Sequence, residues 1–352
     1  MKLNFQEFKE YVKANIMTEL PKEYEGAEVQ IHAVTKNNGI ALDGLSIHRK
    51  DTAISPTIYL NEMYEAYQAS GDLDRTLTKL ADIYQDAMYQ TPKGMTFDIN
   101  EGLLAGKARD LITFRVCGYE ANEEQLQSMP HERMGDMAIT YHIIATQSED
   151  GIGSIRLTNS LMQEMGLKES ELKDLALANT VRMYPPTMKS MMEVMEEMMM
   201  GRAVESGDMG RELPEDNMYV LSNTSGINGA STLFYPKMQE QIAEILGNNY
   251  YVLPSSVHEV LIVPDNGQMS QKELAEMVKE VNDTQVPANE VLTYNVYHYD
   301  RQERALTSYL KPSERQKEQK QSLRENLQKA KKRQSMEVTT SKPDRVKQGM
   351  ER

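Results

Sequence analysis

The stretch Tyr251-Val-Leu-Pro254-Ser255-Ser256-Val-His258-Glu259-Val-Leu-Ile-Val-Pro264 places two apolar runs on either side of a short polar segment. Short apolar runs bounded by proline and serine predict two strands joined by a turn. The turn concentrates serine, histidine and glutamate, the residue types that carry nucleophilic and acid–base chemistry. The stretch therefore bears on both the fold and the function.

Helix and strand patterns alternate irregularly around this stretch. A helix is predicted over 234–246, because Gly247 stands where glycine commonly terminates a helix. Ser270 and Glu273 form a capping box that begins another helix, and 291–299 is predicted to be a closing strand. This order predicts an α+β fold, with mixed sheets and helices packed on them, in place of a repeated strand–helix–strand unit.

The N-terminal third begins with a helix pattern and continues with a hairpin. Asn4 and Glu7 form a capping box for a helix predicted over 4–20. Asn38-Gly39 between two extended runs is a strong hairpin signal. The other predicted elements are a short strand at 57–60, helices at 61–69, 73–90, 158–165 and 169–181, and strands at 110–118, 137–146, 151–157 and 218–222.

Composition divides the chain into three parts. An N-terminal α+β part is predicted for 1–100 and a second, closely packed α+β part for 101–310. The segment 201–217 is rich in glycine and acidic residues, which predicts a mobile loop. Polar and charged residues dominate from 311 to 352, so we predict a charged helix followed by a disordered tail.

Charge is distributed unevenly along the chain. The whole sequence carries a formal net charge of −14 at pH 7, whereas 311–352 holds 13 Lys or Arg against 6 Asp or Glu, a balance of +7. The first 310 residues therefore carry −21, a charge that repels nucleic acid and anionic membranes. Contact with nucleic acid is predicted only through the basic patch of the tail, which consists of Lys329, Lys331, Lys332 and Arg333.

The sequence offers no recognisable cofactor site. The one cysteine, Cys117, excludes an internal disulfide and a cysteine-based zinc site, and it favours a cytoplasmic location. No apolar run is long enough to span a membrane, and no membrane contact is predicted. Gly151-Ile-Gly153 is only a fragment of a dinucleotide fingerprint, and the 6 histidines lack metal-motif spacing. No cofactor and no metal are predicted.

The candidate polar cluster consists of Ser255, Ser256, His258 and Glu259, with Asn223 and Asn228 from a neighbouring loop. On an extended segment, the side chains of Ser256 and His258 point to the same face about 7 Å apart. Catalysis would need a turn that brings the two groups into hydrogen-bonding range. The alternatives are a ligand-binding edge and a turn whose serine hydroxyls bond the local backbone.

A methionine-rich helix is predicted over 187–200. Its methionines recur at helical spacing and are Met188, Met191, Met192, Met195, Met198 and Met199. Methionine fills irregular gaps in cores and also suits surfaces that accept more than one partner. The helix is therefore predicted either to pack on its own domain or to form a partner groove or movable lid.

Several phrases of the sequence together resemble a known family. They are Asn37-Asn-Gly-Ile-Ala-Leu-Asp-Gly-Leu45, Ser55-Pro-Thr-Ile-Tyr-Leu-Asn61, Met129-Pro-His-Glu-Arg133, Asp136-Met-Ala-Ile-Thr-Tyr141, Asn228-Gly-Ala-Ser231 and Leu253-Pro-Ser-Ser-Val-His-Glu-Val-Leu-Ile-Val-Pro264. Over about residues 3–300 the chain is similar to an uncharacterised bacterial family, common in gut Gram-positive bacteria and catalogued as a domain of unknown function of the 5688 type. The resemblance implies no activity and no catalytic residues.

These observations lead us to expect a cytoplasmic, non-enzymatic binding or adaptor module with an unknown protein partner. Two alternatives stay open. One is a hydrolase or transferase that uses Ser256, His258 and Glu259, and the other is a nucleic-acid accessory factor that acts through the basic tail.

Overall fold

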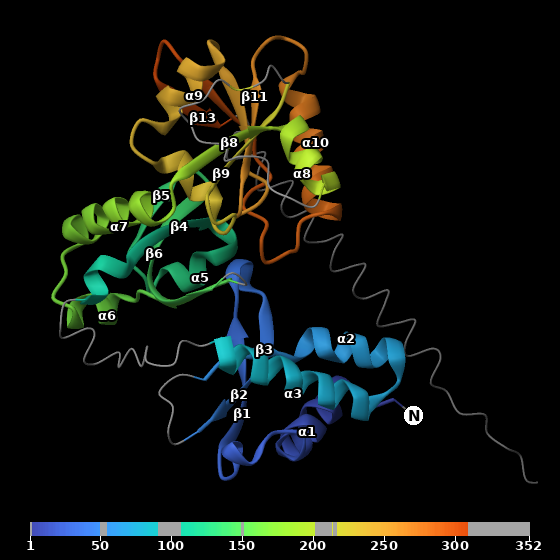
Figure 1. Ribbon diagram of the computed structural model, residues 1–352. Coiled ribbons are helices and arrows are strands. Elements are labelled where there is room, and N and C mark those ends of the chain that lie inside the picture. The colour runs from blue at the N-terminus through green and yellow to red at the C-terminus, as the bar shows by residue number, and fades with distance from the viewer. Residues whose placement is uncertain are drawn as a thin grey trace, which may run out of the picture.

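The computed structural model describes residues 2–49, 55–90, 107–148, 151–200, 213 and 217–308 of the 352-residue chain. These residues form three antiparallel sheets with helices packed against them (Figure 1). The predicted α+β class is confirmed. The loop predicted at 201–217 lies almost wholly outside the described residues, and the predicted tail lies entirely outside them.

Three helices pack on the first sheet. The sheet has the order β1 (Glu28–Thr35), β2 (Ala41–His48) and β3 (Ile58–Tyr59), and the helices are α1 (Phe5–Asn15), α2 (Leu60–Ser70) and α3 (Leu73–Gln90). Phe8, Leu45 and Leu80 are fully buried between the two layers. The predicted capping box at Asn4 is confirmed. The first helix is shorter than predicted, because the chain passes into a 3-10 turn at Ile16–Thr18.

The predicted hairpin is confirmed. β1 and β2 pair from Glu28↔His48 to Thr35↔Ala41, and a short 3-10 turn at Asn37–Gly39 connects them. Asn38 has a φ of 61°, in the left-handed region that asparagine tolerates better than most residues. The tip of the hairpin points away from the N-terminal core toward the rest of the molecule (Figure 1).

The second sheet is built around one long central strand. Its strands are β4 (Ile112–Gly118), β5 (His131–Met134), β6 (Met137–Ser148) and β7 (Gly151–Arg156), and the nearby helices are α5 (Glu123–Leu126), α6 (Asn159–Glu164) and α7 (Glu169–Met183). β4 pairs with one edge of β6, while β5 and β7 pair with the other edge. β5 is a strand that the sequence did not predict.

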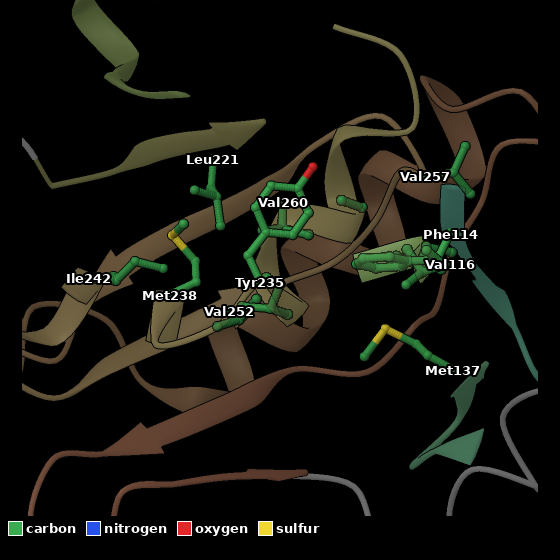
Figure 2. Close-up of a cluster of buried hydrophobic side chains, with 14 of the residues drawn as sticks. Phe114, Val116, Met137, Leu221, Tyr235, Met238, Ile242, Val252, Val257 and Val260 are labelled. Carbon is green, nitrogen blue, oxygen red and sulfur yellow. The ribbon is translucent and has the colours of Figure 1, made fainter. Parts of the chain in front are cut away.

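The two faces of the second sheet differ in chemistry, because successive side chains of a strand point to opposite faces. Phe114 and Val116 of β4 belong to the large buried cluster that also contains residues of the third sheet. Figure 2 shows these two side chains in the same cluster as Met137 and Val252. Arg115 alternates with them and therefore points to the other face of the sheet.

The third sheet has six strands in the order β13-β12-β10-β11-β9-β8. They are β8 (Pro186–Ser190), β9 (Tyr219–Asn223), β10 (Tyr250–Leu253), β11 (Val260–Pro264), β12 (Tyr297–Asp300) and β13 (Ala305–Ser308), and the helices are α8 (Met191–Met200), α9 (Met238–Leu246) and α10 (Gln271–Thr284). Tyr250 and Val252 share a buried cluster with α9, whereas Tyr251 and Leu253 share one with α10. Helices therefore cover both faces of this sheet.

Three further predicted elements have wrong boundaries. Residues 187–190 form β8 and not the start of a helix, because they pair with β9 from Pro186↔Asn223 to Ser190↔Tyr219. The helix predicted over 234–246 begins at Met238, because Gly229–Phe234 forms a 3-10 helix. The closing strand predicted over 291–299 is limited to β12, because the preceding residues bond instead to the loop after β10.

Hydrogen bonds join the hairpin tip to the rest of the molecule. Nδ2 of Asn38 donates to the carbonyl oxygens of Ala288 and Val291 at 2.9 and 2.7 Å. The side chain of Asn37 donates to the carbonyl of Asn289 at 2.9 Å. The buried clusters on the two sides of this junction are separate. Polar contacts therefore set the position of the hairpin here, and not a shared apolar core.

Candidate functional site

The loop between β10 and β11 holds most of the predicted polar cluster. The hydroxyl oxygen of Ser256 accepts a hydrogen bond from the backbone N–H of His258 at 3.0 Å. Nδ1 of His258 accepts one from the backbone N–H of Asn228 at 3.3 Å. Ser255 and Ser256 are both buried. The hydroxyl of Ser256 therefore closes the local turn, and the neighbouring loop holds the imidazole.

Asn223 lies apart from the serines of the predicted cluster, whereas Glu259 interacts with the side chains of Ser256 and His258. The side chain of Asn223 stays in its own turn, where Nδ2 donates to the carbonyl of Ile227 at 3.0 Å. Burial raises the pKa of Glu259, against the opposing effect of His258. Between the described side chains of Ser256 and His258 there is no nucleophile–base hydrogen bond of the kind that the hydrolase hypothesis needs.

A pocket of about 740 Å³ lies where three parts of the chain meet. Residues 32–37 of β1 and the hairpin tip form one wall, and the polar face of the second sheet forms the floor. The loops that contain 257–258 and 289–290 close a third side. His258 of the predicted cluster is therefore one edge of a larger site.

Arg115, His142 and Arg156 line the floor of this pocket from neighbouring strands. His142 of β6 pairs with Thr113 of β4 on one side and with Arg156 of β7 on the other. Arg115 follows Thr113 by two residues and lies on the same face. Since neighbouring strands are about 4.8 Å apart, the two arginines belong to strands separated by roughly 10 Å.

Arg115 carries an unused hydrogen-bond donor. Its Nη2 atom is buried and has no hydrogen-bond partner among the described residues. Burial lowers the pKa of Arg115 to about 10, with Tyr184 opposing this effect and the charge of Arg156 adding to it. The guanidinium is therefore still charged at neutral pH. A buried donor without an acceptor destabilises a protein by roughly 1–3 kcal/mol, and more when it is charged.

The pocket carries more positive than negative charge. Nη1 of Arg156 donates to Oε1 of Gln125 at 2.7 Å, and Nζ of Lys36 lies 4.1 Å from the ring centroid of Tyr59. Glu290 is the one carboxylate among the described residues that line the pocket. A cationic hollow in a chain of net charge −14 favours an anionic ligand.

We expect the stability of the protein to fall below about pH 6.5 because of His142. Burial lowers the pKa of His142 well below its ordinary value, and Arg115 and Arg156 act in the same direction. As the pH falls, the unfolded state therefore takes up this proton first. The stabilisation is present above the ordinary pKa of about 6.5 and is lost toward the folded-state pKa, by up to about 1.4 kcal/mol per pH unit.

Urea unfolding between pH 7.5 and 5 measures this contribution. The variant His142→Gln has no titrating group at this position, so its free energy of unfolding is expected to fall less steeply than that of the wild type. The same slope in both proteins would contradict the assignment.

Most methionines of α8 face solvent. The exposed members of the predicted stripe are Met192 and Met195, at 59% and 56%, and Met198 and Met199, each at 78%. Met191 is half-buried, and Met188 is fully buried in β8. Met192, Met195, Met198 and Met199 therefore do not pack on the described part of the domain, whereas Met188 does. The predicted basic patch Lys329, Lys331, Lys332 and Arg333 lies outside the described residues.

Other kinds of site find little support in the described part of the chain. No group of three or more His, Cys, Asp or Glu side chains there could hold a metal ion. No helix in the described ranges is long and apolar enough to cross a membrane. Burial raises the pKa of the Cys117 thiol to about 12, and a thiol of that kind is unreactive.

Comparison with protein-family models matched residues 5–301 to a family of unknown function, DUF5688. The chain belongs to this family. The predicted membership of a family of unknown function is thereby confirmed, and every residue that lines the pocket falls inside the range matched to DUF5688. A search of curated proteins and a search of solved structures each found no match.

Sequence reasoning did not single out the floor of the pocket, although a signal for it is present. Thr113 and Arg115 alternate with apolar residues in one predicted strand, and Thr140 and His142 do so in another. Such alternation predicts a sheet with one polar face. The sequence does not show that these strands are neighbours or that the hairpin covers them.

Proposed function

We propose that the protein is a non-enzymatic binding module that holds a small organic anion in the pocket between its N-terminal hairpin and its second sheet. The main support for this proposal is that the buried Nη2 atom of Arg115 has no hydrogen-bond partner among the described residues. Buried donors are nearly always satisfied in proteins, and an exception calls for an explanation such as a bound ion or a functional role. Carboxylate and phosphate oxygens match the geometry of a guanidinium group.

The size and lining of the pocket support an organic ligand. A volume of about 740 Å³ falls in the range of pockets that enclose small organic molecules. Leu126 and Met129 line the pocket beside its polar groups, so an apolar part of a ligand would also find contacts. Arg156 and Lys36 add positive charge from the floor and from the hairpin wall.

The environment of the reactive side chains favours binding over catalysis. The Nε2 atom of His142 lies 3.1 Å from the hydroxyl of Thr140, and its lowered pKa keeps the ring neutral. The hydroxyl of Ser256 serves its turn, and the thiol of Cys117 is protonated. These groups therefore act in the architecture of the site, and the hydrolase or transferase hypothesis has less support than the binding hypothesis.

The expectations about location and partners remain predictions. We place the protein in the cytoplasm, which its single cysteine favours. The exposed methionines of α8 support the prediction of a protein partner, because methionine-rich surfaces accept varied apolar partners. A nucleic-acid contact would depend on the basic tail at 311–352.

Calorimetric titration with inorganic phosphate, succinate and citrate tests the proposal. At least one of these anions is expected to bind the wild type. The variant Arg115→Met is expected to weaken that binding by about 30-fold, since a hydrogen bond to a charged group contributes roughly 2 kcal/mol. The matched control is Arg75→Met, which removes an exposed arginine of α3 and is expected to leave the affinity unchanged.

Two results would contradict the proposal. One is the absence of binding by all three anions to the wild type. The other is an equal loss of affinity in the Arg115 and Arg75 variants, which would show that net charge, and not the pocket, attracts the anion.

A further inference from the structure

Glu290 introduces a negative charge into a pocket that is otherwise cationic. The backbone of this residue is fixed, because its carbonyl accepts a hydrogen bond from the N–H of Val257 at 2.9 Å. The neighbouring residue Asn289 accepts one from the side chain of Asn37 in the hairpin tip. The carboxylate is therefore placed by contacts to both the loop after β10 and the hairpin.

The acidic side of the pocket lies close to the C-terminal end of β4. A Cβ atom built on Gly118, the last residue of β4, would come within 2.7 Å of the carbonyl oxygen of Leu292, two residues after Glu290. Arg156 belongs to β7, which pairs with the opposite edge of β6. Glu290 therefore lies near the end of β4, the strand that carries Arg115, whereas Arg156 lies two strands away on β7.

The carboxylate of Glu290 retains acceptor capacity. Its Oε2 atom lies 3.7 Å from Nε2 of His258, which is beyond hydrogen-bonding distance. The side chain is 34% exposed. Burial raises the pKa of Glu259, and the charge of Glu290 contributes to this shift. The negative charge of the two carboxylates is therefore only partly balanced, and a cation beside Glu290 would be stabilised.

We infer that the ligand is zwitterionic, with an acidic group that accepts hydrogen bonds from Arg115 and an ammonium group that donates to Glu290. This inference rests on the proposed function, and it adds the chemical class of the ligand. An amino acid whose two charged groups are separated by a short apolar chain fits the two charged sides and the apolar residues that also line the pocket, among them Leu126 and Met129. A doubly negative ligand still binds at Arg115, but a second charge placed against Glu290 lowers its affinity relative to a zwitterion.

Paired titrations measure the contribution of the ammonium group. The probes are γ-aminobutyrate, δ-aminovalerate and ε-aminocaproate, and each is compared with the plain acid of the same length, which is butyrate, valerate or caproate. At least one amino acid is expected to bind the wild type about tenfold more tightly than its plain acid. The variant Glu290→Gln is expected to abolish this preference and to leave the affinity for the plain acid within about twofold.

Two variants complete the design. Arg115→Met is expected to weaken the amino acid and the plain acid together, whereas Glu290→Gln weakens only the amino acid. Glu276→Gln removes an exposed carboxylate of α10 and is expected to keep the preference of the wild type.

The failures of the inference and of the proposed function are distinguishable. If the wild type binds each amino acid and its plain acid with equal affinity, the inference of a zwitterionic ligand is wrong. If that binding still depends on Arg115, the proposed anion pocket is nevertheless supported. The inference of a zwitterionic ligand would also be wrong if Glu290→Gln kept the preference for the amino acid over its plain acid, or if no probe of the series bound. The anion pocket is tested separately, by whether phosphate, succinate or citrate binds in a way that depends on Arg115.

Discussion

Replacing Gly229 with alanine is expected to lower the free energy of unfolding by about 3 kcal/mol. A Cβ atom at this position would lie 2.1 Å from the hydroxyl oxygen of Ser222 and 2.4 Å from the carbonyl oxygen of His258. These two atoms are hydrogen-bonded to each other at 2.8 Å, so neither can move away without loss of that bond. Urea unfolding followed by far-UV circular dichroism measures the effect.

Gly267→Ala is the control for this substitution. Gly267 has a φ of 75°, and a Cβ atom at this position would meet no atom within 4 Å. Its replacement is therefore expected to cost about 1 kcal/mol, from the backbone conformation alone. An equal effect of the two substitutions would contradict the close approach of Gly229 to the loop that holds His258.

Replacing Arg115 with methionine is expected to raise the free energy of unfolding of the ligand-free protein by about 1–3 kcal/mol. The reason is that the substitution removes a buried charged donor that has no acceptor among the described residues. Methionine has a similar length and can fill the same space without an unsatisfied polar atom. Most substitutions of buried residues have the opposite sign.

The measurement is urea unfolding in a buffer without multivalent anions. Arg75→Met, on the exposed side of α3, is expected to change the free energy by less than about 0.5 kcal/mol. A loss of stability in Arg115→Met would mean that the guanidinium stabilises the fold in the absence of a ligand. The unpaired Nη2 atom of Arg115 would then no longer indicate an anion site.

The parts of the fold that the sequence predicts well are those with local signals. The capping boxes at Asn4 and Ser270 begin helices at the expected residues, since a capping box needs only two side chains three residues apart. The hairpin at Asn38 forms for a similar reason, because its turn geometry is local. Such signals do not depend on the rest of the molecule.

The errors arise where tertiary pairing overrides a local pattern. Residues 187–190 continue the helical spacing of the methionines that follow, yet they pair with β9 and form the edge of the third sheet. β5 and β13 have four residues each, and strands of this length carry little periodicity. Only the pairing with β6 and β12 makes them strands.

The candidate site shows the same division. Residues close in sequence, such as Ser256 and His258, are readily predicted to form a polar cluster, because one short stretch contains them. The residues that define the pocket come from separate segments, with Arg115 on β4, Arg156 on β7 and Glu290 beyond α10. Their convergence depends on strand order and on the docking of the hairpin, neither of which local sequence encodes.

The anion site at Arg115 is tested most directly by locating a heavy oxyanion in a crystal of the protein by anomalous diffraction. Selenate is a suitable probe, because it is tetrahedral and anionic and its selenium atom gives an anomalous signal. We expect a selenate ion on the floor of the pocket, with an oxygen atom about 2.9 Å from Nη2 of Arg115. Selenate ions found only on the exposed surface, with the pocket occupied by water, would contradict the proposed anion site.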